Sequence, residues 1–157
     1  MKVRPTIVID TREQLPYSFN PDSVGTVRRG LDVGDYSLEG FEERVAVERK
    51  SLDDYVGSLI RGRARFLREI TRMQNVPNRL VVVEGSLADV MGWNYRSGVH
   101  PNAVLGGTIS LIVDHEIPVI FCSDRQLACG FTEEYLKRVY RKLTHENNTQ
   151  NGESQSE

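Results

Sequence analysis

The chain of 157 residues is 39% hydrophobic and 27% charged, and its formal net charge is −2. These values are ordinary for one soluble globular domain that is long enough to bury a core. They exclude a strongly basic surface field, so any binding of nucleic acid must depend on local clusters of Lys and Arg.

The cysteines and the N-terminus indicate where the protein works. Cys122 and Cys129 form no CxxC pair and no zinc-ligand pattern with the three histidines. This usage favours a reduced, intracellular setting, which would be cytoplasmic, or nucleoid-associated in a prokaryote or phage. The N-terminal apolar run is too short for a signal peptide or a membrane span, so we expect no membrane partner.

The first third of the chain contains short strands. Apolar runs predict strands at 6–9, 31–38 and 45–48, with Gly34 as a bulge in the second. Ser51 can cap a long helix predicted over 52–74, which the sequence Asn-Val-Pro-Asn then ends.

The rest of the chain alternates helices and strands. The pattern predicts a strand at 80–83, a short helix at 87–91, a helix at 101–116, a strand at 117–121 and a last helix within 124–143. Residues 144–157 are polar and predict a disordered tail after a domain spanning 1–143. The antiparallel start followed by helix–strand–helix–strand predicts an α/β sandwich with a mixed central sheet flanked by helices.

Three charges close the third predicted strand. Side chains alternate along a strand, so Glu48 and Lys50 point to one face and Arg49 to the other. Glu48 can share a site with Asp35 at the end of the neighbouring strand. Two carboxylates and the main-chain carbonyl of Arg49 are oxygen ligands suited to Mg²⁺ or Mn²⁺. Lys50 could orient a water or stabilise negative charge; the alternative is a surface salt-bridge cluster.

Several motifs, taken in order, resemble a known family. They are Val-Ile-Asp-Thr-Arg-Glu at 8–13, Val-Gly-Asp-Tyr at 33–36, Val-Glu-Arg-Lys-Ser at 47–51 with Asp54 beyond, Gly-Ser-Leu at 57–59 with Gly-Arg at 62–63, and Val-Val-Glu-Gly at 82–85. Together they resemble the nuclease domain of XPF-type structure-specific endonucleases, a branch of the PD-(D/E)xK superfamily. The likeness covers about residues 5–140 and implies a restriction-endonuclease-like three-layer sandwich.

The resemblance also implies a catalytic site and a substrate. The family's acidic site falls on Asp10, Asp35, Glu48 and Asp54, with Lys50 as the motif lysine and Arg12, Glu13 and Arg49 beside it. Ideal helix geometry would place Asp53 nearer the apolar face, so the choice of Asp54 rests on the resemblance. Glu13 could instead pair with Arg12, and Glu84 could support the site or be a solvated strand end. The implied substrate is DNA with a flap or fork, cut to leave 5′-phosphate and 3′-hydroxyl ends.

Basic and aromatic residues outside this site are candidates for nucleic-acid contacts. On a continuous 52–74 helix Arg63 would point into the core, where it needs a carboxylate or phosphate partner. Arg61 and Arg65 belong to an arginine stripe that could follow a phosphate backbone or be a solvated face. The 93–98 loop, with Tyr95 and Arg96, could clamp nucleic acid or fill a groove between helices.

The resemblance leaves other functions open. Relatives carry a helix-hairpin-helix module for DNA binding and dimerisation, which does not follow here. We therefore expect a stand-alone form that works as a homodimer or with a separate DNA-targeting protein. A catalytically silent DNA-binding or scaffold module is an alternative, as is a nuclease of this fold that acts on RNA or recombination intermediates.

Overall fold

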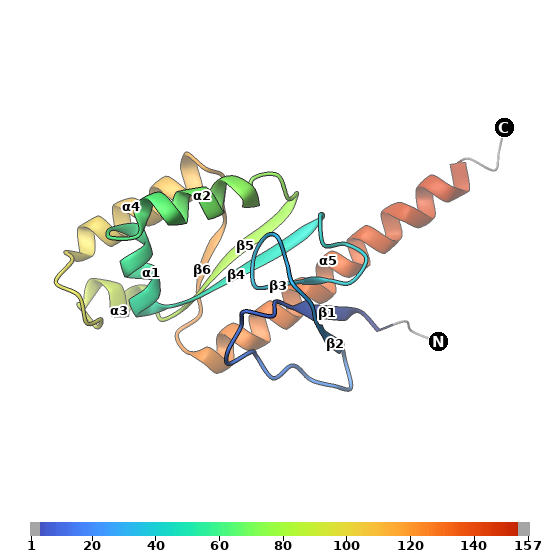
Figure 1. Ribbon diagram of the computed structural model, residues 1–157, viewed down its shortest axis with the longest axis horizontal. Helices are drawn as coiled ribbons and strands as arrows, with labels where there is room; N and C mark the ends of the chain where they lie inside the picture. The colour runs from blue at the N-terminus through green and yellow to red at the C-terminus, as the bar shows by residue number, and fades with distance from the viewer. Residues whose placement is uncertain (1–3, 154–157) are drawn as a thin grey trace.

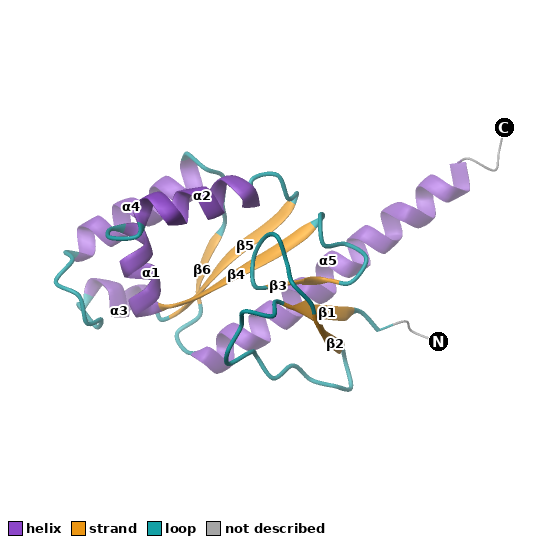
Figure 2. Ribbon diagram, in the orientation of Figure 1, coloured by secondary structure: helices purple, strands orange, loops and turns teal. Residues whose placement is uncertain are grey.

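The computed structural model describes residues 4–153 and places a six-stranded sheet within them (Figures 1 and 2). The strand order is β2-β1-β3-β4-β5-β6. The bounds are β1 (Thr6–Ile9), β2 (Gly25–Arg28), β3 (Tyr36–Leu38), β4 (Val45–Ser51), β5 (Asn78–Glu84) and β6 (Val119–Phe121). Strand β3 runs antiparallel to β1 and β4, whereas the β1–β2, β4–β5 and β5–β6 pairs are parallel, so the predicted mixed sheet is confirmed.

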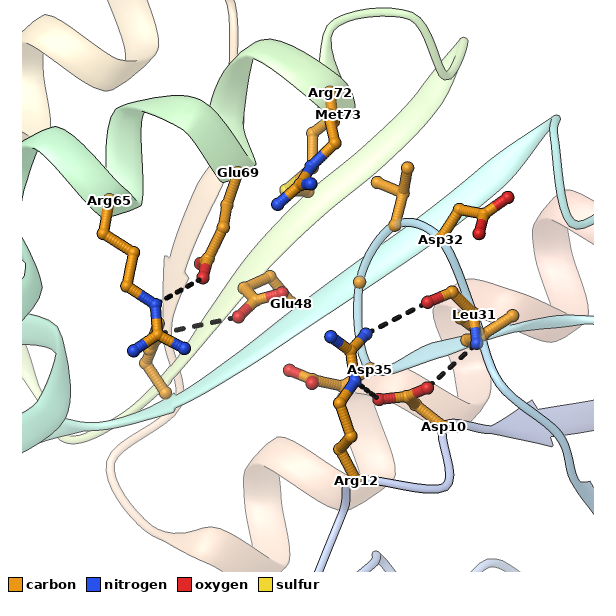
Figure 3. A pocket seen from close by; sticks show the side chains of 13 residues that line it. Asp10, Arg12, Leu31, Asp32, Asp35, Glu48, Arg65, Glu69, Arg72 and Met73 are labelled. Atoms are coloured by element: carbon orange, nitrogen blue, oxygen red, sulfur yellow. Dashed lines mark hydrogen bonds and ion pairs between the residues drawn. The ribbon is translucent and has the colours of Figure 1, made fainter.

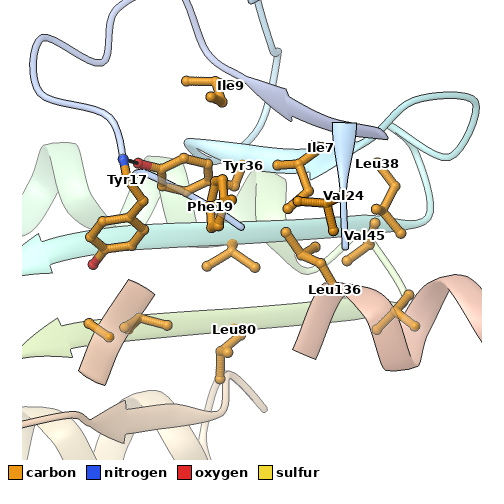
Figure 4. Packing of buried hydrophobic residues seen from close by; sticks show 14 of the residues in the cluster. Ile7, Ile9, Tyr17, Phe19, Val24, Tyr36, Leu38, Val45, Leu80 and Leu136 are labelled. Atoms are coloured by element: carbon orange, nitrogen blue, oxygen red, sulfur yellow. Dashed lines mark hydrogen bonds between the residues drawn. The ribbon is translucent and has the colours of Figure 1, made fainter. Parts of the chain in front are cut away.

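Helices cover both faces of this sheet (Figure 2). Their bounds are α1 (Leu52–Leu59), α2 (Arg63–Met73), α3 (Leu87–Met91), α4 (Pro101–Val113) and α5 (Arg125–Glu153). The alternation of β5 divides the core between them. Leu80 and Val82 join the cluster that contains Leu136 of α5, and Val81 and Val83 join the cluster formed with α1, α2 and α4 (Figure 4). The result is a three-layer sandwich.

The predicted 52–74 helix is two helices. The break falls at residues 60–62, where the N–H of Gly62 donates to the carbonyl of Gly57 at 2.9 Å. Glycine disfavours a helix interior by about 1 kcal/mol relative to alanine, and two glycines stand within six positions here. Because the break changes the phase of α2, helical positions counted from α1 do not apply beyond it.

Three other predicted elements differ from the structure. Strand β2 was not predicted, because its side chains alternate only between half-buried and exposed at the sheet edge. The predicted 31–38 strand is reduced to β3, since Gly34 adopts a φ of +75° and turns the chain. The predicted 117–121 strand begins only at Val119.

The polar tail predicted as disordered is helical as far as Glu153, and its last residues, 154–157, lie outside the described residues. An existing helix extends at the cost of fixing one residue per added hydrogen bond, so the packed first half of α5 nucleates the second half. Arg44 pairs with Glu146 at 3.4 Å and Thr144 Oγ1 donates to the Tyr140 carbonyl at 2.7 Å.

No helix within residues 4–153 combines the length and apolarity that a membrane crossing requires.

Candidate active site in an acidic cleft

A cleft of about 440 Å³ lies between the sheet and α2. Figure 3 shows acidic side chains entering it from the end of β1, from the loop before β3 and from β4, with basic side chains hanging from α2 opposite them. Its charged lining consists of Asp10, Arg12, Asp32, Asp35, Glu48, Lys50, Arg65, Glu69 and Arg72. Asp10, Asp35, Glu48, Lys50, Arg12 and Arg65, predicted from separate stretches of the chain, therefore meet in one place.

Asp35 is held against β4 by its backbone and its side chain. Its N–H donates to the Val47 carbonyl at 2.8 Å, and its Oδ2 accepts from the N–H of Arg49 at 2.8 Å. Gly34 brings the chain this close, because a Cβ at this position would lie only 3.0 Å from the Val47 carbonyl oxygen. The glycine of the Gly-Asp motif thus fixes the carboxylate beside β4.

Asp35 and Glu48 are two carboxylates that share a confined space. Burial raises the pKa of Asp35 to about 6, against the lowering effect of the Arg49 N–H. Burial, and then the charge of Asp35, raise the pKa of Glu48 to about 8. Both groups therefore lack a positive partner sufficient to hold two negative charges, which is the electrostatic condition in which a cation binds.

Lys50 lies on the same face of β4 as Glu48, as the alternation predicted. Its Nζ is 3.6 Å from Glu48 Oε1 and 5.4 Å from the ring centroid of Phe66. The side chain is only 18% exposed. Packing against an aromatic face restricts the lysine, so its charge stays beside the carboxylate pair.

Asp10 is buried and has both oxygens engaged. Oδ1 accepts from the N–H of Leu31 at 2.9 Å and Oδ2 from Arg12 Nε at 2.7 Å. Burial alone would raise the pKa of Asp10, but these two hydrogen bonds outweigh it and lower the pKa below its ordinary value. Asp10 therefore fixes the 31–35 loop and aims Arg12 across the mouth of the cleft (Figure 3).

Arg49 points to the opposite face of β4 and enters a buried ionic cluster. It donates through Nε to Glu13 and through Nη1 to Glu84, both at 3.0 Å. The hydroxyls of Tyr36 and Tyr17 donate to the same two carboxylates, each at 2.8 Å. Glu13 therefore pairs with Arg49, not with Arg12, and Glu84 is a partner of Arg49 instead of a solvated strand end.

The donor set fits a magnesium-type ion. Among residues 4–153, no three His, Cys, Asp or Glu side chains lie close enough to one another to hold a metal. Mg²⁺ is bound through one or two carboxylates, and waters and substrate phosphates complete its shell, so Asp35 and Glu48 are sufficient in number and kind.

Asp53 and Asp54 lie outside the acidic cleft. Both line a second cleft of about 370 Å³ that shares Lys50, Arg65 and Glu69 with the first. The N–H of Asp54 donates to the Ser51 side chain, while Asp53 accepts from Arg96. The role predicted for Asp54 would thus have to act from one cleft away.

Arg63 is exposed and lies against α4 instead of the core. It lines a small hollow with Gly107 and His115, apart from the acidic residues. The predicted inward orientation assumed a continuous 52–74 helix, and the break at 60–62 removes that assumption. Arg61 is exposed at the break, and Tyr95 and Arg96 lie in the loop before α4.

The sequence interpretation did not select Arg72 or Glu69 as site residues. Both line the acidic cleft, and Arg65 pairs with Glu69 at 3.7 Å on the same face of α2. The spacing 65, 69, 72 marks one helical face and could have indicated this group.

Comparison with known proteins identifies the family. Residues 9–135 match the family model described as the ERCC4 domain. The chain belongs to the ERCC4 domain family. This match and the relatives below confirm the predicted XPF-type nuclease domain. The motif acids Asp10, Asp35 and Glu48, with Lys50, lie within the matched span.

Two curated relatives and two solved structures resemble this ERCC4 domain. A protein of Methanocaldococcus jannaschii named as an ATP-dependent RNA helicase is 32% identical over 120 residues, or 76% of this chain and 14% of its own length. The 3′-flap repair endonuclease Xpf of Saccharolobus solfataricus is 28% identical over 149 residues, or 92% of this chain and 58% of its own length. The chain thus spans well under two thirds of either relative.

The structural neighbours are two structures of XPF from Aeropyrum pernix, one of them in complex with DNA. The complex gives a TM-score of 0.66 at 22% identity and covers 89% of this chain and 66% of the other. The second gives 0.68 at 22% identity and covers 86% and 61%. These likenesses confirm the restriction-endonuclease-like fold.

Proposed function

We propose that this ERCC4 domain is a Mg²⁺- or Mn²⁺-dependent DNA endonuclease. The observation that carries the proposal is the pair formed by Asp35 and Glu48, two carboxylates with raised pKa values in a cleft that also holds Lys50. A purely structural cluster would have no reason to retain two carboxylates whose charges repel each other.

The ligands of the ion would be Asp35, Glu48 and the main-chain carbonyl of Arg49. Asp10 would support them by fixing the 31–35 loop, or would face a second ion, and Asp54 would assist from the adjoining cleft. A bound Mg²⁺ or Mn²⁺ would polarise the scissile phosphate and make a bound water more acidic.

The chain's cations would bind the phosphates. Lys50, held 3.6 Å from Glu48, would stabilise the negative charge that develops on the phosphate or orient the attacking water. Arg12, Arg65 and Arg72 line the same cleft and would hold the flanking phosphates, since guanidinium groups match phosphate geometry. Each side chain thus has one role that a substitution can test.

The proposed substrate is branched DNA, such as a flap or fork, cut in repair or recombination. The name of the S. solfataricus relative, a 3′-flap repair endonuclease, supports this class. RNA is the second candidate because the M. jannaschii relative is named as an RNA helicase. A catalytically silent scaffold is less well supported, since the acids and the lysine of the motif are all present.

A substrate panel tests the proposal. Purified protein is incubated with labelled flap, fork, blunt duplex, single-stranded DNA and RNA in Mg²⁺, Mn²⁺ or EDTA. We expect cleavage of flap and fork that depends on the divalent ion. The absence of cutting of every substrate would contradict the nuclease proposal, and equal cutting of flap and duplex would contradict the branched-DNA claim.

We also propose that a second copy of the chain, or a separate DNA-targeting protein, contributes to the choice of branched DNA. Light-scattering mass in solution, with and without flap DNA, distinguishes the two. A dimer mass supports the homodimer, and a monomer mass in both conditions leaves only the separate protein.

A further inference from the structure

The acidic cleft has a continuation along α1. The second cleft shares Lys50, Arg65 and Glu69 with it and extends over the α1–α2 connection. Its remaining lining includes Gly57, Ser58 and Gly62, and a Cβ built at Gly57 would meet nothing within 4 Å. A nucleic-acid strand that leaves the acidic cleft in this direction therefore meets an open path.

The loop of residues 92–98 is docked at the far side of this path. Asp53, which lines the second cleft, accepts from the N–H of Arg96 at 2.9 Å, and its other oxygen is 3.6 Å from Arg96 Nε. The Arg96 side chain is 94% exposed. The loop is thus fixed to the first turn of α1, and its cation faces solvent beside the path.

This loop presents its tryptophan to solvent. Trp93 is 47% exposed, although the loop itself is held by hydrogen bonds from the Trp93 N–H to Val90 and from Asn94 to Asp89. Its ring stacks on Tyr95 with a centroid distance of 6.4 Å and an interplanar angle of 21°. The edge of its ring system meets His100 at 5.1 Å. The surrounding rings restrict the indole but do not bury it.

The backbone of Trp93 is also unusual. Its φ of 59° lies in the left-handed region, which a bulky residue adopts only when its surroundings impose it. Both an exposed indole and a positive φ cost free energy. A base-stacking role explains why the loop would maintain both, because an aromatic face next to a cation is what single-stranded nucleic acid binds.

We propose that Trp93 stacks on an unpaired base of a single-stranded arm that leaves the acidic cleft along α1, with Arg96 beside its backbone. This rests on the nuclease function proposed above and adds the feature that distinguishes single strand from duplex. Bases in a duplex have both faces covered by their neighbours, so they cannot stack on Trp93. Asp53 and Asp54 repel phosphates from the floor of the path, which turns the bases of the arm toward the protein.

Tryptophan fluorescence tests this directly, because Trp93 is the one tryptophan in the sequence. The full chain in EDTA, where no cutting is expected, is titrated with oligothymidylate of 15 nucleotides, a blunt duplex and a flap. We expect saturable quenching by the oligothymidylate and the flap and little change with the duplex.

A displaced tryptophan is the matched control. In the variant Trp93→Phe/Leu127→Trp the fluorophore lies on α5, on the other face of the sheet, where Leu127 is 57% exposed. Its fluorescence should not respond to the oligothymidylate. A response equal to that of Trp93 would show nonspecific quenching and overturn the proposal.

Binding of the unlabelled variants to a fluorescein-labelled oligothymidylate supplies a second measurement. Trp93→Asn, which tolerates the positive φ, should weaken binding by about tenfold, equal to about 1.4 kcal/mol. Met91→Ala removes a side chain of equal exposure two positions earlier and should change it less than about twofold. Unchanged binding by Trp93→Asn would contradict the stacking role.

The outcomes also separate this proposal from the nuclease. If the flap is cut but no single-stranded DNA quenches Trp93, the stacking platform is wrong and the nuclease stands. If Trp93 is quenched but no substrate is cut with any divalent ion, the loop binds single strands as proposed and the nuclease function fails.

Discussion

At the scale of single residues, β4 separates two kinds of charge. Glu48 and Lys50 face the acidic cleft, whereas Arg49 between them enters the buried cluster with Glu13 and Glu84. Burial raises the pKa of Tyr17, and Glu84 raises it further, so Tyr17 stays protonated and donates to that carboxylate. The two sides share one strand, so the buried cluster fixes the backbone that carries the cleft residues.

Arg49→Met should destabilise the fold strongly. It leaves two buried carboxylates without their cation, a loss of about 3–5 kcal/mol in the free energy of unfolding. Urea unfolding measures it. The triple variant Glu13→Gln/Arg49→Met/Glu84→Gln should recover much of the loss, because no unpaired charge remains.

Arg29→Ala is the control for this variant. It removes a half-exposed arginine that pairs with Glu39 and Glu42 at the surface, and should cost less than about 1 kcal/mol. Equal losses for Arg29→Ala and Arg49→Met would contradict the account of the buried cluster.

The cleft pair should make stability depend on pH. Because the native pKa values of Asp35 and Glu48, about 6 and about 8, lie above those of unfolded carboxyls, the native state binds more protons than the unfolded state. The metal-free protein should therefore lose stability as the pH rises from about 4 through 8, on the order of a few kcal/mol.

Urea unfolding at pH 5 and pH 8.5 measures this dependence. Glu48→Gln should flatten it, since only one of the two coupled charges remains, and Mn²⁺ should restore stability to the wild type mainly at the higher pH. The exposed Glu43→Gln should keep the full dependence. A wild-type stability that rises across this interval would contradict the assignment.

Single residues differ in how far the sequence predicted them. Asp35, Glu48 and Lys50 follow from strand alternation and motif order, and the structure brings them together. The pairing of Arg49 with Glu13 joins residues 36 positions apart, and no local pattern encodes it. The same holds for Trp93, whose exposure depends on how the 92–98 loop docks on α1.

At the scale of elements, the turn at Gly34 positions the site. It places Asp35 beside β4, and the hydrogen bond from the Asp35 N–H to the Val47 carbonyl holds it there. The sequence indicated a special backbone at this glycine, but whether it was a bulge within a strand or a turn before one depends on the tertiary contact with β4.

Gly34→Ala should destabilise the protein by about 2 kcal/mol and slow any cleavage, because the methyl group meets both a positive φ and the Val47 carbonyl oxygen at 3.0 Å. Gly40→Ala shares the positive φ but meets no atom within 4 Å, so it should cost about 1 kcal/mol and leave cleavage unchanged. Unfolding curves and initial cleavage rates check both, and equal effects would show that the close approach is unimportant.

The α1–α2 break illustrates a limit of periodicity. Apolar spacing predicted both helices but not the change of phase between them, because the break depends on backbone geometry at residues 60–62. The consequence reaches function, since Arg65 and Arg72 face the acidic cleft while Arg63 faces α4.

At the scale of the whole molecule, three layers place the cleft on one side and the supporting core on the other. Helix α5 packs Leu136 and Leu143 against the strands behind the site, and its last turns extend away from the sheet (Figure 1). The sequence predicted the layers and the mixed sheet, because these follow from element order. It did not predict the length of α5, since exposed polar residues lack a periodic signal.

The two halves of α5 should contribute unequally to stability. Leu136→Ala removes a fully buried side chain and should cost about 2–5 kcal/mol. Ending the chain after Glu146 removes only exposed residues from the described part of the helix and should cost less than about 1 kcal/mol. Thermal and urea unfolding compare the two, and a large loss on truncation would show that the extension packs on the domain.

The most direct test of the central claim is the single-turnover rate of flap cleavage in Mn²⁺ by four proteins: the wild type, Asp35→Asn, Glu48→Gln and Asp32→Asn. Asp32 lines the same cleft but is exposed. We predict that Asp35→Asn and Glu48→Gln each slow cleavage by about 100-fold or more, while Asp32→Asn stays within about threefold of the wild type. Wild-type rates in both Asp35→Asn and Glu48→Gln would show that the acidic cleft is not the catalytic site.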